Sequence, residues 1–132
     1  MDSIANMLSQ IKNAGNARKK ETEVKYSKMN SAILNILKNQ GFIENFEEKF
    51  VNNQKYPSKI IVKLKYKNQN EPYLEDILRV SSPGRRIYVK SGKINRLSRG
   101  KTEFLISTSK GVMSGKEAHK KGLGGEVLCE VK

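Results

Sequence analysis

The last part of the chain decides the fold that the sequence predicts. It reads FLISTSKGVMSGKEAHKKGLGGEVLCEV, residues 104–131. The apolar residues at 104–106 predict a short strand. The next five residues, STSKG at 107–111, mostly carry small hydroxyl side chains and predict a loop directly after that strand.

A short helix and a final strand follow in the same stretch. Ser114 and Glu117 have the spacing of a capping box, which predicts a helix that begins after Ser114. The glycines at positions 122, 124 and 125 break that helix. Residues 126–131 then predict the last strand. The order of strand, loop, helix and strand indicates mixed α and β structure.

The segment before this stretch contains a turn between two strand-like runs. ILRV and RRIYV flank Ser81-Ser82-Pro83-Gly84, and the Pro-Gly pair suits the central positions of a type II turn. In the second run, alternation sends Arg86 and Tyr88 to the same face. A guanidinium beside an aromatic ring can bind phosphate and stack on a base, but a tyrosine on a strand can equally belong to the core.

The start of the chain predicts an amphipathic helix. Ile4, Met7, Leu8 and Ile11 recur at the spacing of one helix face, with Ser3 as the expected N-cap and Gly15 near the end. The opposite face carries Lys12 with Gln10 and Asn13. Lys12 can donate to an RNA phosphate, or it can simply face water.

A strand, a second helix and two more strands are predicted next. Residues 22–26 form a short strand, and Ser27 precedes a helical pattern that Gly41 ends as the residue after the C-cap. Lys28 lies at the start of this helix. Strands are then expected from Phe42 onward and at 60–64, where lysines alternate with apolar residues.

The polar segment KNQNEPY, residues 67–73, contains Pro72 and is expected to connect two lobes. We predict an N-terminal αβαββ lobe over residues 1–68 and a β-rich C-terminal lobe with one short helix over residues 74–132. The predicted fold class is therefore α/β (α+β), with two small lobes that each contain a short β-sheet and packed helices.

The charge of the chain indicates its partner. Lysine and arginine number 26 against 13 acidic residues, a formal net charge of +13 at pH 7. Self-repulsion of this size favours a polyanionic partner. Basic residues exceed acidic ones on both sides of Glu75, so the charge belongs to a folded surface and not to a tail. A lysine-rich surface that only faces water is the alternative.

Catalysis, metals and membranes have little support. One histidine, His119, and one cysteine, Cys129, cannot supply a zinc site or a disulfide, and we expect no cofactor. Cys129 is expected to be a small buried side chain. A triad built from Ser107 or Ser109 with His119 and Glu117 is not forced by the spacing. We expect neither export nor a membrane span, and the glycine-containing stretches do not match a phosphate loop.

Two short stretches suit a nucleic-acid backbone. The hydroxyl groups of residues 107–111 can donate and accept at close range, and the glycines of GLGGE, residues 122–126, allow another backbone to approach. Such groups can read RNA 2′-hydroxyls and splayed bases. Glu126 can hold an arginine in place, accept from a base or sugar, or form an ordinary structural ion pair.

The run at 107–131 closely resembles the C-terminal signature of the universal small ribosomal subunit protein eight family, of the bacterial or organellar type. Three other segments resemble the family in the same order: DSIANMLSQIKNA, ILNILKNQGFIENF and VSSPGRRIYVK. Together they cover nearly the whole chain. Departures are Ser3 where proline is frequent, His119 where arginine is usual, and Lys132 where many members end in tryptophan.

The resemblance implies a non-enzymatic protein that binds the central domain of small-subunit ribosomal RNA early in assembly, mainly through its C-terminal lobe. Implied partners are neighbouring small-subunit proteins and, as in some bacterial members, its own messenger RNA. The implied location is the ribosome in the bacterial cytoplasm or a plastid stroma. Together with Arg86, Lys28 and Lys12, the expected RNA-binding residues are Ser107, Thr108, Ser109, Gly111, Tyr88, Gly124, Gly125 and Glu126.

Two other classes of function compete with this interpretation. A generic binder of double-stranded DNA would share the basic charge, but no recognition helix is apparent. A hydrolase would need Ser107 or Cys129 as its nucleophile. Competition by duplex DNA and turnover of acyl substrates distinguish these alternatives from an RNA binder.

Overall fold

The computed structural model describes residues 2–52, 54–69, 71–96 and 102–132. Contacts between residues divide the chain into two units, Ser3–Glu75 and Asp76–Lys132. Each unit contains its own antiparallel sheet and at least one helix. The mixed α and β class predicted from the sequence is confirmed.

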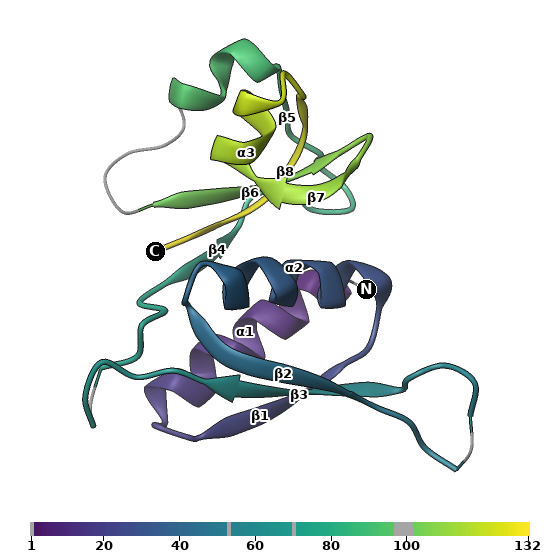
Figure 1. The fold of residues 1–132 in the computed structure, drawn as a ribbon, viewed down its shortest axis with the longest axis vertical. Coiled ribbons are helices and arrows are strands. Elements are labelled where there is room, and N and C mark those ends of the chain that lie inside the picture. Colours follow the sequence, from purple (N-terminus) through teal and green to yellow (C-terminus); the bar gives the residue numbers. More distant parts are fainter. Residues whose placement is uncertain (1, 53, 70, 97–101) are drawn as a thin grey trace. The chain divides into compact units, whose positions relative to one another are not determined.

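The first unit packs two helices on a small sheet (Figure 1). Its strands lie in the order β1-β3-β2, and α1 contacts β1 and β3 whereas α2 contacts β2. Alternate residues of β3, Ile60 and Val62, are fully buried, as expected for a strand with one face on the core. The elements are α1 (Ser3–Asn16), β1 (Glu21–Lys25), α2 (Lys28–Asn39), β2 (Ile43–Lys49) and β3 (Lys59–Leu64).

The predicted ends of α2 are confirmed, but those of α1 are partly wrong. Ser27 Oγ accepts from the backbone N–H of Asn30 at 3.0 Å, and Gly41 takes a left-handed φ of +81° after the helix. Ser3, in contrast, is already part of α1. The left-handed residue after α1 is Arg18 (φ 59°), while Gly15 lies inside the helix against the ring of Pro72.

Residues 67–73, expected to connect two lobes, fold back within the first unit. Tyr66 and Pro72 form an isolated antiparallel bridge, and the backbone N–H of Lys67 donates to the carbonyl of Glu71 at 2.7 Å. The ammonium group of Lys65 lies 4.7 Å from the ring centroid of Tyr73. These contacts place the described residues of the segment, 67–69 and 71–73, in the first unit.

The second unit is a sheet in the order β4-β8-β6-β7, with β5 paired to β8 (Figure 1). A short helix and a 3-10 helix cover an apolar cluster in which Ile94, Ala118 and Val127 are buried. The sequence did not predict the 3-10 helix. The elements are β4 (Ile77–Arg79), β5 (Tyr88–Val89), η1 (Ser91–Arg96), β6 (Glu103–Thr108), β7 (Gly111–Ser114), α3 (Gly115–Lys120) and β8 (Gly125–Val131).

The predicted start and end of α3 are confirmed. Ser114 Oγ accepts from the backbone N–H of Glu117 at 3.2 Å, which is the first half of the expected capping box. Gly122 takes a left-handed φ of +69° and ends the helix. Local sequence therefore fixed both boundaries of α3.

Three local predictions for the second unit are wrong. Residues 107–111 are not a loop, because β6 continues to Thr108 and β7 begins at Gly111. The turn at 82–85 is not type II, because Gly84 does not have the positive φ that this turn requires. The run RRIYV forms a strand only at Tyr88 and Val89, because Ser82 and Arg85 bond to each other across a tight bridge instead.

Candidate nucleic-acid interface

Three of the expected RNA-binding residues lie side by side across three neighbouring strands. Tyr88 of β5 pairs with Glu126 of β8, which in turn pairs with Ser107 of β6. Residues directly opposite each other in antiparallel strands project to the same face of the sheet. We call this set, Tyr88, Glu126 and Ser107, the recognition row.

Tyr88 is exposed and is not part of the core. Its exposed fraction is 68%, and no described residue forms a hydrogen bond with its hydroxyl group. The interpretation of Tyr88 as half of the core is therefore wrong. The ring presents its surface to solvent, where it can stack on a base or a sugar.

Glu126 forms an ion pair with Arg86. The Arg86 Nη1 atom lies 3.3 Å from one carboxylate oxygen of Glu126 and 3.4 Å from the other. The arginine side chain is 56% exposed and the glutamate side chain 15%. Because the arginine is largely in water, the pair adds little to stability. Its main effect is to hold the Arg86 guanidinium beside Glu126, the middle residue of the row.

The hydroxyl groups of the β6–β7 turn differ in whether they form hydrogen bonds within the protein. Thr108 Oγ1 donates to the carbonyl of Gly111 at 2.8 Å and accepts from the backbone N–H of Lys110 at 3.1 Å. The hydroxyl hydrogen of Thr108 is therefore donated within the turn. Ser107 and Ser109 make no side-chain hydrogen bond to any described residue. These two hydroxyls are available to a ligand.

The glycines of the site are required by the packing of the protein itself. A β-carbon on Gly124 would lie 2.5 Å from the carbonyl oxygen of Val89, and one on Gly125 would overlap the carbonyl oxygen of Ser107. Gly111, with a φ of +109°, provides the backbone conformation that closes the β6–β7 turn. These residues bring the strands of the row into close contact and shape the surface beside it.

Ser81 supports the segment that carries Arg86, and sequence reasoning missed it. Its side chain is fully buried; Oγ accepts from the backbone N–H of Ile87 at 2.9 Å and donates to the carbonyl of Ile87 at 3.3 Å. The hydroxyl thus substitutes for ladder bonds where the strand is interrupted. No sequence signal separates this serine from the neighbouring Ser82.

Lys12 and Lys28 belong to the first unit and not to the recognition row. Lys12 lies on α1 and Lys28 is the first residue of α2, and both side chains are exposed. Each is accessible to a polyanion. The structure gives no further reason to prefer them over the other exposed lysines of the unit.

The triad that sequence reasoning considered is not assembled. Because the hydroxyls of Ser107 and Ser109 have no described hydrogen-bond partner, neither is bonded to His119. His119 Nδ1 instead lies 2.7 Å from the carbonyl oxygen of Ser91. Burial raises the pKa of the Cys129 thiol to about 12, so this side chain is not a nucleophile near neutral pH.

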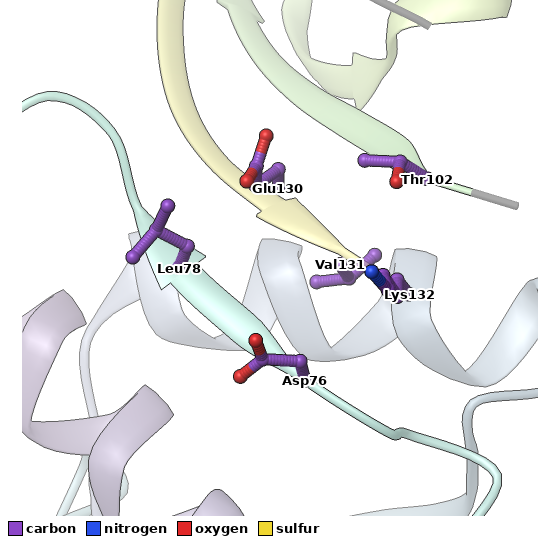
Figure 2. A pocket seen from close by; sticks show the side chains of 6 residues that line it. All are labelled: Asp76, Leu78, Thr102, Glu130, Val131 and Lys132. Atoms are coloured by element: carbon purple, nitrogen blue, oxygen red, sulfur yellow. The ribbon is translucent and has the colours of Figure 1, made fainter. Parts of the chain in front are cut away.

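One pocket of the second unit lies beside β4 and the end of β8 (Figure 2). It has a volume of about 70 Å³, well below the several hundred cubic ångströms typical of a small-molecule site. The pocket is lined by Asp76, Leu78, Thr102, Glu130, Val131 and Lys132.

Within the described residues, no group of three or more acidic, histidine or cysteine side chains could hold a metal ion. No described helix is long and apolar enough to cross a bilayer.

Comparisons with known proteins agree over nearly the whole chain. The family model described as "Ribosomal protein S8" matches residues 2–131. The chain is 49% identical over 130 residues to "Small ribosomal subunit protein uS8" of Wolbachia pipientis wMel and 48% identical to the protein of the same name from Nitrosomonas europaea. In both cases the alignment covers 98% of this chain and 96% of the relative.

Proposed function

Since the chain belongs to the ribosomal protein S8 family, we propose that its second unit binds the central domain of small-subunit ribosomal RNA through the recognition row. Membership makes the protein a structural constituent of the small ribosomal subunit, located in the ribosome in the cytoplasm. The family binds small-subunit RNA and ribosomal proteins and is not enzymatic.

The observation that carries the proposal is the pairing of Tyr88, Glu126 and Ser107 across three strands. An exposed ring, a positioned guanidinium and two unpartnered hydroxyls then lie within one surface of the second unit. Stacking on a ring tolerates any base, whereas short hydroxyls distinguish the 2′-hydroxyl of RNA from DNA. The row therefore fits an RNA backbone with at least one splayed base.

Glu126 acts in this proposal by positioning Arg86. Both carboxylate oxygens lie within 3.4 Å of one Nη1 atom, which leaves the other guanidinium nitrogens of Arg86 to donate to a phosphate. A carboxylate alone would repel the RNA backbone. Paired with an arginine, it directs that arginine toward the ligand.

The remaining charge supplies attraction without selectivity. With a net charge of +13, the protein attracts any polyanion at low salt, and this attraction weakens as counterions compete. Exposed lysines such as Lys12, Lys28 and Lys90 contribute to it. Selectivity comes from the row, which on binding stabilises one fold of the central domain during assembly.

We propose that the recognition row also binds the protein's own messenger RNA. A segment of message that copies the bound RNA shape would present the same 2′-hydroxyls and the same splayed base to the row. Binding would then compete with translation. Competition between the central-domain fragment and the message for one site tests this extension.

The test is binding of the purified full-length protein to a folded central-domain fragment and to a base-paired RNA of equal length, over a salt titration. Selective binding that persists as salt rises is expected. Equal binding of both RNAs, with release at the same salt, would show that charge alone acts. Preferential competition by duplex DNA would favour the generic DNA binder instead.

Two variants separate shape recognition from charge. Ser109→Trp fills the surface beside the row, and Lys90→Ala removes one exposed charge. We expect Ser109→Trp to lower the selectivity between the two RNAs by about tenfold or more. Lys90→Ala should lower both affinities slightly and reduce the number of counterions released on binding, read from the salt dependence of the affinity, by about one. Equal losses of selectivity in the two variants would contradict the separation of shape recognition from charge.

A further inference from the structure

The β2–β3 hairpin of the first unit ends in an exposed cluster of aromatic and basic side chains. Figure 1 shows the hairpin extending away from α1 and α2. Its register is fixed by the pair Lys49–Lys59 and by the bond from the Ser58 N–H to the Lys49 carbonyl at 2.9 Å. We call residues 50–58, apart from residue 53, the hairpin tip.

The tip exposes an unusual amount of apolar surface. Six large apolar side chains of the described residues are exposed, and three of them lie here: Phe50, Val51 and Tyr56. The exposed fractions of Phe50 and Tyr56 are 57% and 68%. Single exposed apolar residues are common, but a cluster at the end of a projecting hairpin indicates a contact surface.

The charge around these rings identifies the chemistry of the partner. Residues 49–59 contain three lysines and no aspartate or glutamate. Lys49 and Lys59 pair with glutamates of the sheet, but Lys55 has no carboxylate partner among the described residues. Its ammonium group lies 5.9 Å from the ring centroid of Tyr56. A cation beside the exposed ring of Tyr56, in the same hairpin tip as the exposed ring of Phe50, suits an anionic partner with flat aromatic groups.

We propose that the hairpin tip is a second RNA contact, at which Phe50 and Tyr56 stack on unpaired bases and Lys55 contacts the adjacent phosphate. This inference rests on the proposed function for the RNA partner but not on the recognition row. Single-stranded nucleic acid combines π-faces with negative charge, which is the combination that the tip complements. The exposed amides of Asn52 and Gln54 can donate to and accept from base edges.

The experiment compares three forms of the full-length protein on complete small-subunit ribosomal RNA, by affinity and by chemical probing of the unpaired nucleotides. They are the wild type, Phe50→Ala/Tyr56→Ala, and Phe50→Leu/Tyr56→Leu. The leucine variant keeps apolar bulk and loses the aromatic plane. Leu78→Ala is the control, because Leu78 has a similar exposed fraction, 56%, in the second unit.

We expect both double variants to weaken binding by about tenfold or more and to expose one discrete set of unpaired nucleotides. The control, Leu78→Ala, should neither weaken binding nor expose these nucleotides. All variants should keep the melting temperature of the wild type, because the substituted side chains are exposed. Ser109→Trp is probed alongside them. Protection by the recognition row should persist in both double variants and be lost in Ser109→Trp.

Two results would overturn the inference. Unchanged affinity and protection in the alanine variant would show that the tip does not touch RNA. Loss in the alanine variant with retention in the leucine variant would show that apolar bulk, and not stacking of the rings on bases, makes the contact. Failure of the proposed function is separate, because it would appear as unchanged protection in Ser109→Trp.

Discussion

The carbonyl oxygen of Ser107 occupies the place where a β-carbon on residue 125 would lie, so β6 and β8 approach each other this closely only because residue 125 is glycine. Both residues belong to the surface proposed to bind RNA. Gly125 therefore shapes that surface through the packing of the sheet, and any side chain there would push the Ser107 strand away.

Gly125→Ala tests this relationship. We expect the free energy of unfolding to fall by about 3 kcal/mol, since overpacking against backbone cannot be relieved by a rotamer change. The measurement is urea denaturation. Gly84→Ala is the matched control, because nothing lies within 4 Å of its β-carbon position and its φ is not positive. A loss of equal size in both variants would contradict the steric explanation.

Ser81→Ala should destabilise the protein by about 1–3 kcal/mol, because it leaves the partly buried N–H of Ile87 without its partner. Ser82→Ala, one residue further on, should stay within about 0.5 kcal/mol of the wild type, because its hydroxyl makes no described hydrogen bond. Thermal unfolding of the two variants compares them directly. Similar melting temperatures would show that Ser81 has no special role.

Thr108→Val separates turn stability from RNA binding. The variant loses the Thr108 hydroxyl bonds to Gly111 and Lys110 and should cost about 1 kcal/mol of stability. The RNA affinity of the folded variant should change less than that of Ser109→Ala, because the Ser109 hydroxyl has no described partner within the protein. The reverse order of RNA affinities would assign the contact to Thr108.

A double-mutant cycle decides how Glu126 acts. If Glu126 positions Arg86, Glu126→Gln should lower RNA affinity in the wild type and have almost no further effect in Arg86→Ala. The cycle is measured by RNA binding at fixed salt. An effect of Glu126→Gln that is equally large in both backgrounds would mean that the carboxylate contacts RNA itself.

Cys129 should be unreactive in the folded protein. Burial raises the pKa of its thiol to about 12, whereas an unfolded cysteine titrates at about 8.5. The contribution to stability is therefore fully present below pH 8.5 and is lost as the pH rises toward 12, because only the unfolded state releases the proton in that window. A thiol reagent at pH 8 should label the protein only after denaturant is added; rapid labelling of the native protein would contradict this.

Local sequence was sufficient wherever a few neighbouring residues fix the structure. The caps at Ser27 and Ser114 and the left-handed glycines at 41 and 122 were predictable, because each satisfies backbone groups within one helical turn. The type of the turn at Pro83-Gly84 was not predictable. A Pro-Gly pair permits more than one turn type, and the bridge between Ser82 and Arg85 selects a type other than the predicted type II.

The candidate site was predictable as a list of residues but not as an arrangement. Motif resemblance pointed to Tyr88, Glu126 and Ser107, and composition suggested a polyanion. Whether Tyr88 was buried or exposed depended on the strand beside it. The exposed ring, the Arg86–Glu126 pair and the buried hydroxyl of Ser81 all arise from contacts between residues far apart in the chain.

The sequence by itself determined the mixed α and β class, the boundaries of α2 and α3 and the basic character, because these depend on periodicity, local hydrogen bonds and residue counts. Only the tertiary structure decided the strand register that aligns Tyr88 with Glu126 and Ser107, and the strand contact that requires Gly125. Register is set by which strands meet and by which side chains they bury together. That information is distributed over the whole sheet, and no single stretch of sequence contains it.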